Sequence, residues 1–271
     1  MRTASVIVRG WVAVLLTVLV PLQPARAADL QLIDAPTGLA WSGDAVAQAG
    51  AGSAAIVLAS AAKAGALGCF THCDTIERVW RRLSSVVSQQ QQASARPFEL
   101  VLHVVQSTDV DAFAAPDGTL VLSEDFVRRR HIDDAQLAFV LAHEVAHVLL
   151  EHERQALTAA LAILPRVASR TVEDIYVEFG FNLGVVRLLE PVRHQAEYEA
   201  DELGLEIAAL AAYLPAEQLG YMENEAAADS PVDAVVSTHP TGPNRLRRLR
   251  ARLPLAERIY TYAAQHGMQA P

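Results

Sequence analysis

The hydrophobic pattern divides most of the chain into long helices. Residues 74–92 carry Ile76, Val79, Leu83 and Val86 on one side of a helical repeat, which is the period of an amphipathic helix. A second helix is expected through "AQLAFVLAHEVAHVLLEHERQALTAAL" (135–161), with Asp133 or Asp134 as its N-cap. A third helix is expected at 191–213, because proline suits a first helical turn, and a terminal helix follows "STHPTGPNRLRRLRARL".

Two short stretches are expected to form strands. "FELVLHVVQS", from Phe98, is compact and rich in β-forming residues. The stretch Thr119 to Leu122 follows a Pro-Asp-Gly turn. No internal repeat or second-domain signature is visible, which favours a single domain. The expected helices and strands together predict a fold that is mainly α with a small β-sheet (α+β), and the sheet precedes the second helix.

The first 27 residues are predicted to be a signal peptide. Arg2 and Arg9 precede the apolar run "WVAVLLTVLVPL", and the segment ends in Ala25-Arg26-Ala27, the three-part pattern of secretion with cleavage after Ala27. The apolar run is short for a membrane span, and no lipoprotein cysteine follows it. The expected location is therefore the periplasm, with an Ala/Gly-rich arm at 28–74 and a single domain at 75–271.

Charge narrows the classes of partner. Because the 27 residues hold three arginines and no acids, the net charge of −9 becomes −12 once they are removed. An acidic surface argues against nucleic acid as a partner. The Ala/Gly-rich residues 44–68 of the arm are expected to form a weakly specified helix that is a poor membrane span. This helix is expected to be either mobile or packed on the surface.

Two cysteines leave two interpretations open. Cys69 and Cys73 are four residues apart, so a local disulfide is feasible in an oxidising compartment. A metal site with His72 is the alternative, although three ligands need help from elsewhere.

The segment "HEVAHVLLEH" (143–152) places ionisable side chains inside an apolar helix, where each needs a partner. His143 and His147 stand one turn apart on the same face, so both can bind one metal ion. Glu144 lies about 100° around the axis from His143, where it can reach a water but is not an easy ligand. This HExxH arrangement is typical of zinc metallopeptidases, although it also arises by chance.

The 191–213 helix supplies carboxylates for the same site. Glu197 and Asp201 of "EYEAD" are four residues apart and share a face, whereas Glu199 is out of phase with it. Glu197 can be the third ligand and leave the fourth position to water. Asp201 can accept the spare ring N–H of a liganding histidine. A solvated acidic face is the plainer reading of these carboxylates.

With these motifs the chain resembles the HtpX and CAAX-prenyl-protease superfamily of zinc peptidases, especially its soluble periplasmic BepA- and LoiP-like members. The resemblance covers roughly residues 75–250 and rests on "DAFAAPDG", "HEVAH" with a further His152, "EYEAD" with Gly204, and "STHP" followed by Arg245. It implies a gluzincin-like metallopeptidase domain built around the HExxH helix and a second ligand helix. The implied site has one Zn²⁺, with His143, His147 and Glu197 as ligands and Glu144 as catalytic base.

The chain departs from the family pattern near the third ligand and in the turn. Arg193 and His194 stand where Ser-Arg is usual, Asp111 replaces an Asn, and Asp117 replaces a Gly. These changes remove no ligand but bear on hydrogen bonding around Glu197 and on substrate preference.

Three residues outside the ligand set, His239, Arg245 and His152, are expected to lie near the metal site or the end of its helix. His239 of "STHP" is expected near the open metal position, as an oxyanion donor or a resting fourth ligand, with Arg245 holding its segment to an acidic neighbour. His152 lies five residues after His147, about 140° around the helix, so packing is expected rather than ligation.

The predicted function is a zinc endopeptidase that cleaves unfolded or misassembled envelope proteins. A substrate is expected to add to an edge strand formed by Thr119, Leu120, Val121 and Leu122. The alternatives are a peptide-binding, chaperone-like module with a structural zinc and no turnover, and a helical protein with a chance motif. Residues 158–190 are expected to cover the site, or to meet a membrane, an envelope protein or another partner, and the number of assembled chains stays open.

Overall fold

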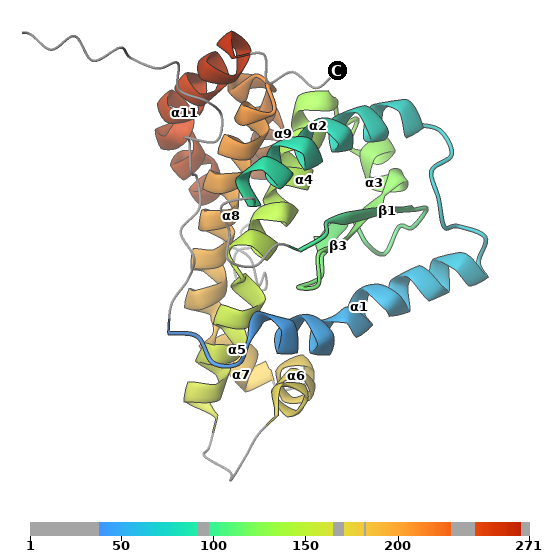
Figure 1. The fold of residues 1–271 in the computed structure, drawn as a ribbon, viewed down its shortest axis with the longest axis vertical. Coiled ribbons are helices and arrows are strands. Elements are labelled where there is room, and N and C mark those ends of the chain that lie inside the picture. Colours follow the sequence, from blue (N-terminus) through green and yellow to red (C-terminus); the bar gives the residue numbers. More distant parts are fainter. Residues whose placement is uncertain (1–37, 92–97, 165–170, 182, 229–241, 267–271) are drawn as a thin grey trace, which may run out of the picture.

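Helices surround one small sheet in the computed structural model, which describes residues 38–91, 98–164, 171–181, 183–228 and 242–266 (Figure 1). The fold is mainly α with a three-stranded sheet, as the hydrophobic pattern predicts. The elements are α1 (Gly43–Lys63), α2 (Cys73–Gln91), β1 (Val101–Val105), β2 (Ala112–Ala114), β3 (Thr119–Ser123), α3 (Glu124–Arg129), α4 (Asp134–Leu149), α5 (His152–Ile163), α6 (Val172–Phe181), α7 (Leu183–Leu188), α8 (Glu190–Leu210), α9 (Pro215–Ala228) and α11 (Gly242–Gln265).

The sheet has the order β1-β3-β2, with β1 parallel and β2 antiparallel to β3. The predicted edge strand, Thr119 to Leu122, is therefore the central strand, and that prediction was wrong: the backbone groups of β3 are engaged by a neighbour on each side. The strand β2 was not predicted at all, since its three residues are too few to show a period. Of the two edge strands, β2 is the one that lies against α4, the helix of His143 and His147.

The alternation along β3 divides the interior into two parts. Leu120 and Leu122 join the main core, which lies between the sheet and the helices α2, α4, α8, α9 and α11. Val121 points to the opposite face, where it packs with Ala54 and Ala61 of α1. This follows from the period of two in a strand, and in Figure 1 the sheet lies between α2 and α1.

The predicted helix 135–161 is interrupted. The first part, α4, begins at the N-cap Asp133, whose side chain accepts from the Gln136 N–H at 2.9 Å. It ends at Leu149 with Leu150 as its C-cap. Glu151 then adopts the left-handed conformation, with φ 53° and ψ 39°, before α5 starts at His152. The prediction of one continuous helix was wrong because this break carries no Gly or Pro to announce it.

Helix α1 covers the sheet face that carries Val121. It is long and apolar enough to cross a membrane by length and composition, with a mean hydropathy of 1.5 and 22% of that stretch buried. Val46, Ala54 and Ala61 face inward, whereas the outward Ile56 is 73% exposed. The prediction that the arm packs on the surface is confirmed for this helix. The prediction that it is a poor membrane span is not supported by its length and composition.

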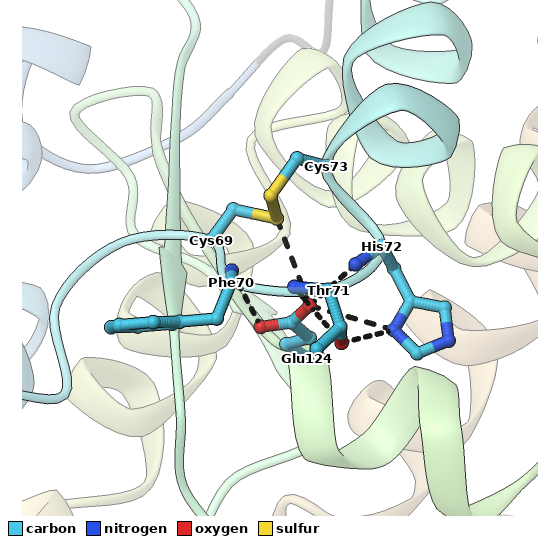
Figure 2. The surroundings of a disulfide bond; sticks show 6 residues. All are labelled: Cys69, Phe70, Thr71, His72, Cys73 and Glu124. Carbon is cyan, nitrogen blue, oxygen red and sulfur yellow. Dashed lines mark hydrogen bonds and ion pairs between the residues drawn. A yellow bond between two sulfur atoms is a disulfide. The ribbon is translucent and has the colours of Figure 1, made fainter.

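The cysteines form a disulfide in the loop before α2 (Figure 2). The Cα atoms of Cys69 and Cys73 are 5.4 Å apart. The buried Glu124 carboxylate accepts hydrogen bonds from the backbone N–H groups of Phe70, Thr71 and His72 and from the Thr71 hydroxyl, at 2.9, 2.5, 2.6 and 2.6 Å. Although Glu124 lies close enough to the sulfurs to join a metal site, the disulfide occupies both of them, which overturns the metal alternative.

Candidate metal centre

His143, His147 and Glu197 bring three donor atoms together between α4 and α8. The Nε2 atoms of the two histidines are 3.1 Å apart, and each lies 3.6 Å from a Glu197 carboxylate oxygen. Donors bound to one tetrahedral zinc at about 2.0–2.2 Å would be separated by about 3.3–3.6 Å. The three residues therefore have the separation and chemistry to hold one zinc ion.

Asp201 lies behind His143, one helical turn beyond Glu197 on α8. Its Oδ1 is 3.0 Å from the His143 Nδ1, the ring nitrogen on the far side from the cluster. Arg245 of α11 donates two hydrogen bonds to the same carboxylate, at 2.8 and 2.7 Å, and its guanidinium is 3.6 Å from Glu197. The acidic neighbour expected for Arg245 is thus Asp201, in a bidentate pair.

His152 lies behind the other histidine. Its Nδ1 is 3.0 Å from the His147 Nδ1, and its Nε2 is 3.2 Å from Glu199. The expected helical phase of His152 was wrong, because the break at Glu151 ends the helix between the two histidines. Glu199 faces away from the donor cluster, as its phase predicts, but it reaches this region through His152.

Glu144 stands beside the cluster without being one of its three members. Its carboxylate lies near the backbone of Ala114 in β2, whose N–H acts to lower the pKa of Glu144. The residue is partly buried. The proximity of Glu144 to Ala114 was not predicted, because β2 itself was not predicted.

Burial and neighbouring charges set the protonation of the metal-free cluster. Burial, opposed by His143 and reinforced by the Glu197 charge, raises the pKa of Glu144 to about 7. Burial would lower the pKa of His143, but the Asp201 and Glu197 carboxylates outweigh it and raise that pKa. Burial and the neighbouring His143 hold the pKa of His147 well below its usual value. These opposed shifts are typical of a functional site.

The edge of the sheet nearest to Glu144 directs some of its backbone groups away from β3. The β2–β3 pair uses the Asp111 carbonyl, which accepts from Ser123, and the Ala115 N–H, which donates to Thr119, both at 2.8 Å. In an antiparallel pair successive residues point their backbone groups to opposite sides. Ala112 and Ala114 therefore direct theirs away from β3, toward the side of Glu144.

Two predicted features fall outside the described residues. The proposed signal peptide at 1–27 is one, and His239 is the other. Part of the 158–190 segment is described, and there α5 and α6 pack with the start of α1 through Leu157, Ile175 and Val46.

The chain is similar to mitochondrial metalloendopeptidases. It is 31% identical over 161 residues to the mitochondrial metalloendopeptidase OMA1 of Schizosaccharomyces pombe, covering 58% of this chain and 47% of that protein. It is 29% identical to the OMA1 proteins of Bos taurus and Homo sapiens, each match covering 59% of this chain and 33% of the relative. The chain thus spans less than half the length of these relatives.

These relatives correct the predicted location. They are named mitochondrial, so the periplasmic prediction was wrong. Nor are these relatives the BepA- and LoiP-like proteins that the motifs suggested.

The broader resemblance is upheld by the match to a protein-family model. The model of peptidase family M48 covers residues 77–253, a span that includes the HExxH helix, the Glu197 helix and Arg245. The chain belongs to peptidase family M48.

Proposed function

We propose that the protein is a zinc-dependent endopeptidase that cleaves unfolded or misassembled proteins. One observation carries the proposal. Glu144 directly follows His143, a member of a three-donor cluster with zinc-like spacing, and its carboxylate lies near the backbone of Ala114 in the edge strand β2. A proton acceptor, a metal position and a peptide-binding edge are the three parts that peptide hydrolysis needs.

In this proposal His143, His147 and Glu197 hold one zinc ion per chain. When bound, zinc supplies Lewis acidity toward the scissile carbonyl and the attacking water. Three protein ligands leave a coordination position open, which is the arrangement of catalytic sites, whereas structural zinc sites have four protein ligands. The donor set thus favours turnover over a purely structural metal.

Glu144 acts as the general base. It accepts a proton from the attacking water and later delivers that proton to the leaving amine. Its carboxylate lies near Ala114 of the edge strand, where a peptide would bind.

The substrate would bind along β2, which is an edge strand. It would not bind along β3, because β3 is the central strand. The outward groups of Ala112 and the outward carbonyl of Ala114 can form hydrogen bonds with an extended peptide, which is β-addition. This mode recognises the backbone more than the side chains, and it requires a segment that is not already folded. Removal of unfolded or misassembled proteins follows as the proposed role.

The test combines zinc content with proteolysis. The wild-type chain should contain about one zinc and cleave an unfolded, fluorescently labelled protein, and a chelator should abolish cleavage. Glu144→Gln should keep the zinc and the fold but lose proteolysis by roughly 10²-fold or more. Undiminished cleavage by the zinc-loaded variant would disprove the role of Glu144. A zinc-replete wild type without turnover would instead favour the peptide-binding module.

A further inference from the structure

We propose that His152 and Glu199 position His147 as a zinc ligand, through a chain of hydrogen bonds that runs from Glu199 to His152 to His147. The inference rests on the proposed zinc site and assigns two residues that lie outside its three-donor cluster. Both act through His147, so they are positioning residues and neither touches the substrate or the metal.

The contacts form one continuous chain. From the donor cluster outward, the His147 Nδ1 lies 3.0 Å from the His152 Nδ1, and the His152 Nε2 lies 3.2 Å from Glu199 Oε2. The other Glu199 oxygen accepts from the Gln195 side-chain amide at 2.7 Å. His152 is only 4% exposed, so its polar contacts with protein groups are the main substitute for water.

The chemistry fixes the direction of each hydrogen bond. A histidine that binds zinc through Nε2 carries its proton on Nδ1, so His147 must donate at Nδ1. His152 must then accept at its own Nδ1, which places its proton on Nε2. That proton points at the Glu199 carboxylate, the acceptor that holds this tautomer. Each of the two hydrogen bonds has one donor and one acceptor under this assignment alone.

The break between α4 and α5 brings His152 into contact with His147. In a continuous helix, residues five apart point about 140° away from each other. Glu151 instead adopts the left-handed conformation, which is unfavourable for a residue with a side chain. Its carboxylate accepts a hydrogen bond from Arg154 at 2.7 Å, which helps to hold the break. The strained residue sits at the point where the chain must turn to bring His152 under His147.

The arrangement parallels the support of His143. Metal-binding histidines usually donate their second ring N–H to a carboxylate, carbonyl or water. Asp201, at 3.0 Å from the His143 Nδ1, is placed to do this for His143 directly, whereas Glu199 reaches His147 through an imidazole. The Glu199 side chain is 40% exposed, against 1% for Asp201. We therefore expect Glu199 to contribute less than Asp201 and His152 to contribute more than Glu199.

The experiment measures zinc affinity by chelator competition in the full chain. His152→Leu fills the buried space but removes the acceptor, so zinc affinity should fall by about 10- to 100-fold. His152→Asn keeps an oxygen near the Nδ1 position and should recover part of that loss. Glu199→Gln should weaken zinc binding by about 10-fold. Glu202→Gln, on the same helix but paired with Arg248 at 3.2 Å, is the matched control and should leave affinity unchanged.

The visible spectrum of the cobalt-substituted protein separates positioning from folding. If His152 orients His147, the absorption bands of His152→Leu should differ from those of the wild type while the apo variant stays folded. Wild-type affinity and an unchanged spectrum in His152→Leu would overturn the proposal. If His152→Leu does not fold, Glu199→Gln decides, since its half-exposed site tolerates the change, and affinity equal to Glu202→Gln would overturn it.

The same preparations distinguish this proposal from the proposed function. A wild type that binds no zinc, or cleavage that survives in Glu144→Gln, would defeat the zinc peptidase itself. A wild type that binds zinc and cleaves, beside a His152→Leu variant of unchanged affinity, would defeat only the positioning chain.

Discussion

Gly204 of α8 lies against the backbone of His143, so closely that a Cβ atom at position 204 would stand 2.9 Å from the His143 nitrogen and 3.0 Å from its Cα. The two helices approach each other at the residue that carries a donor of the cluster. Asp201 and Glu197 lie about one and two turns earlier on α8, so this close approach sets their distance from His143. The glycine is thus part of the geometry of the site.

Gly204→Ala should lower both stability and zinc affinity. The obstructing atoms belong to the backbone and cannot rotate away, so α8 must shift, at a cost of about 1–3 kcal/mol. Chemical denaturation of the metal-free protein and chelator competition measure the two effects. Gly220→Ala is the control: its Cβ would meet the Gln136 side-chain amide at 2.7 Å, which can move, and alanine favours a helix. Equal stability of the two variants would contradict the prediction.

Glu197→Ala should weaken zinc binding more than Asp201→Asn does. Glu197 offers an oxygen to the donor cluster, whereas Asp201 acts through the far nitrogen of His143, and such indirect partners typically account for about 10- to 100-fold in affinity. Competitive chelator titrations give the order. A reversed ranking would mean that the two carboxylates have exchanged roles.

Glu124 should make stability depend on acid pH. Burial alone would raise the pKa of Glu124, but hydrogen bonds from Thr71 and from the backbone of His72 and Phe70 lower it from 4.5 to about 2. The ionised form therefore stabilises the fold above about pH 4.5, and this stabilisation is lost as the pH falls toward 2. The loss should be about 3 kcal/mol, read from denaturation curves across that range.

Glu124→Gln isolates this contribution from the other acids. The variant should be less stable at neutral pH and should show a flatter fall below pH 4.5. Glu77→Gln, which removes an exposed carboxylate paired with Arg81, should keep the wild-type curve. Parallel curves for wild type and Glu124→Gln would contradict the assignment.

His239→Ala tests the residue of "STHP" by steady-state kinetics. We predict a fall in kcat of up to roughly 10²- to 10³-fold with little change in KM, as expected when an oxyanion donor is lost. Higher basal activity would instead identify a resting ligand that must leave before turnover. Unchanged kinetics would remove His239 from the site.

The fold was largely predictable where the chain repeats a local period. Ile76, Val79, Leu83 and Val86 of α2 are all buried, as their spacing predicts. The helix boundaries near Asp133 and Pro191 were also predictable, because capping and proline chemistry act within one turn. The phase of Glu197 and Asp201 on α8 followed from the same local regularity.

The parts that escaped prediction depend on non-local contacts. The central position of β3 depends on pairing with β1 and β2, which the residues of β3 do not encode alone. The left-handed Glu151 has no glycine to signal it, so the contact between His152 and His147 was lost with it. One signal was available: a histidine buried among apolar side chains needs a polar partner.

The shortness of β2 has a consequence for self-association. A free strand edge that can receive a peptide can equally receive the edge of a second molecule, and long flat edges lead to aggregation. Here the edge is only Ala112–Ala114, and Pro116, which lacks an N–H, follows closely. So short an edge offers few hydrogen bonds to a bound chain. We therefore expect contacts along it to form and dissociate readily, and two copies of the protein should not form a lasting dimer there.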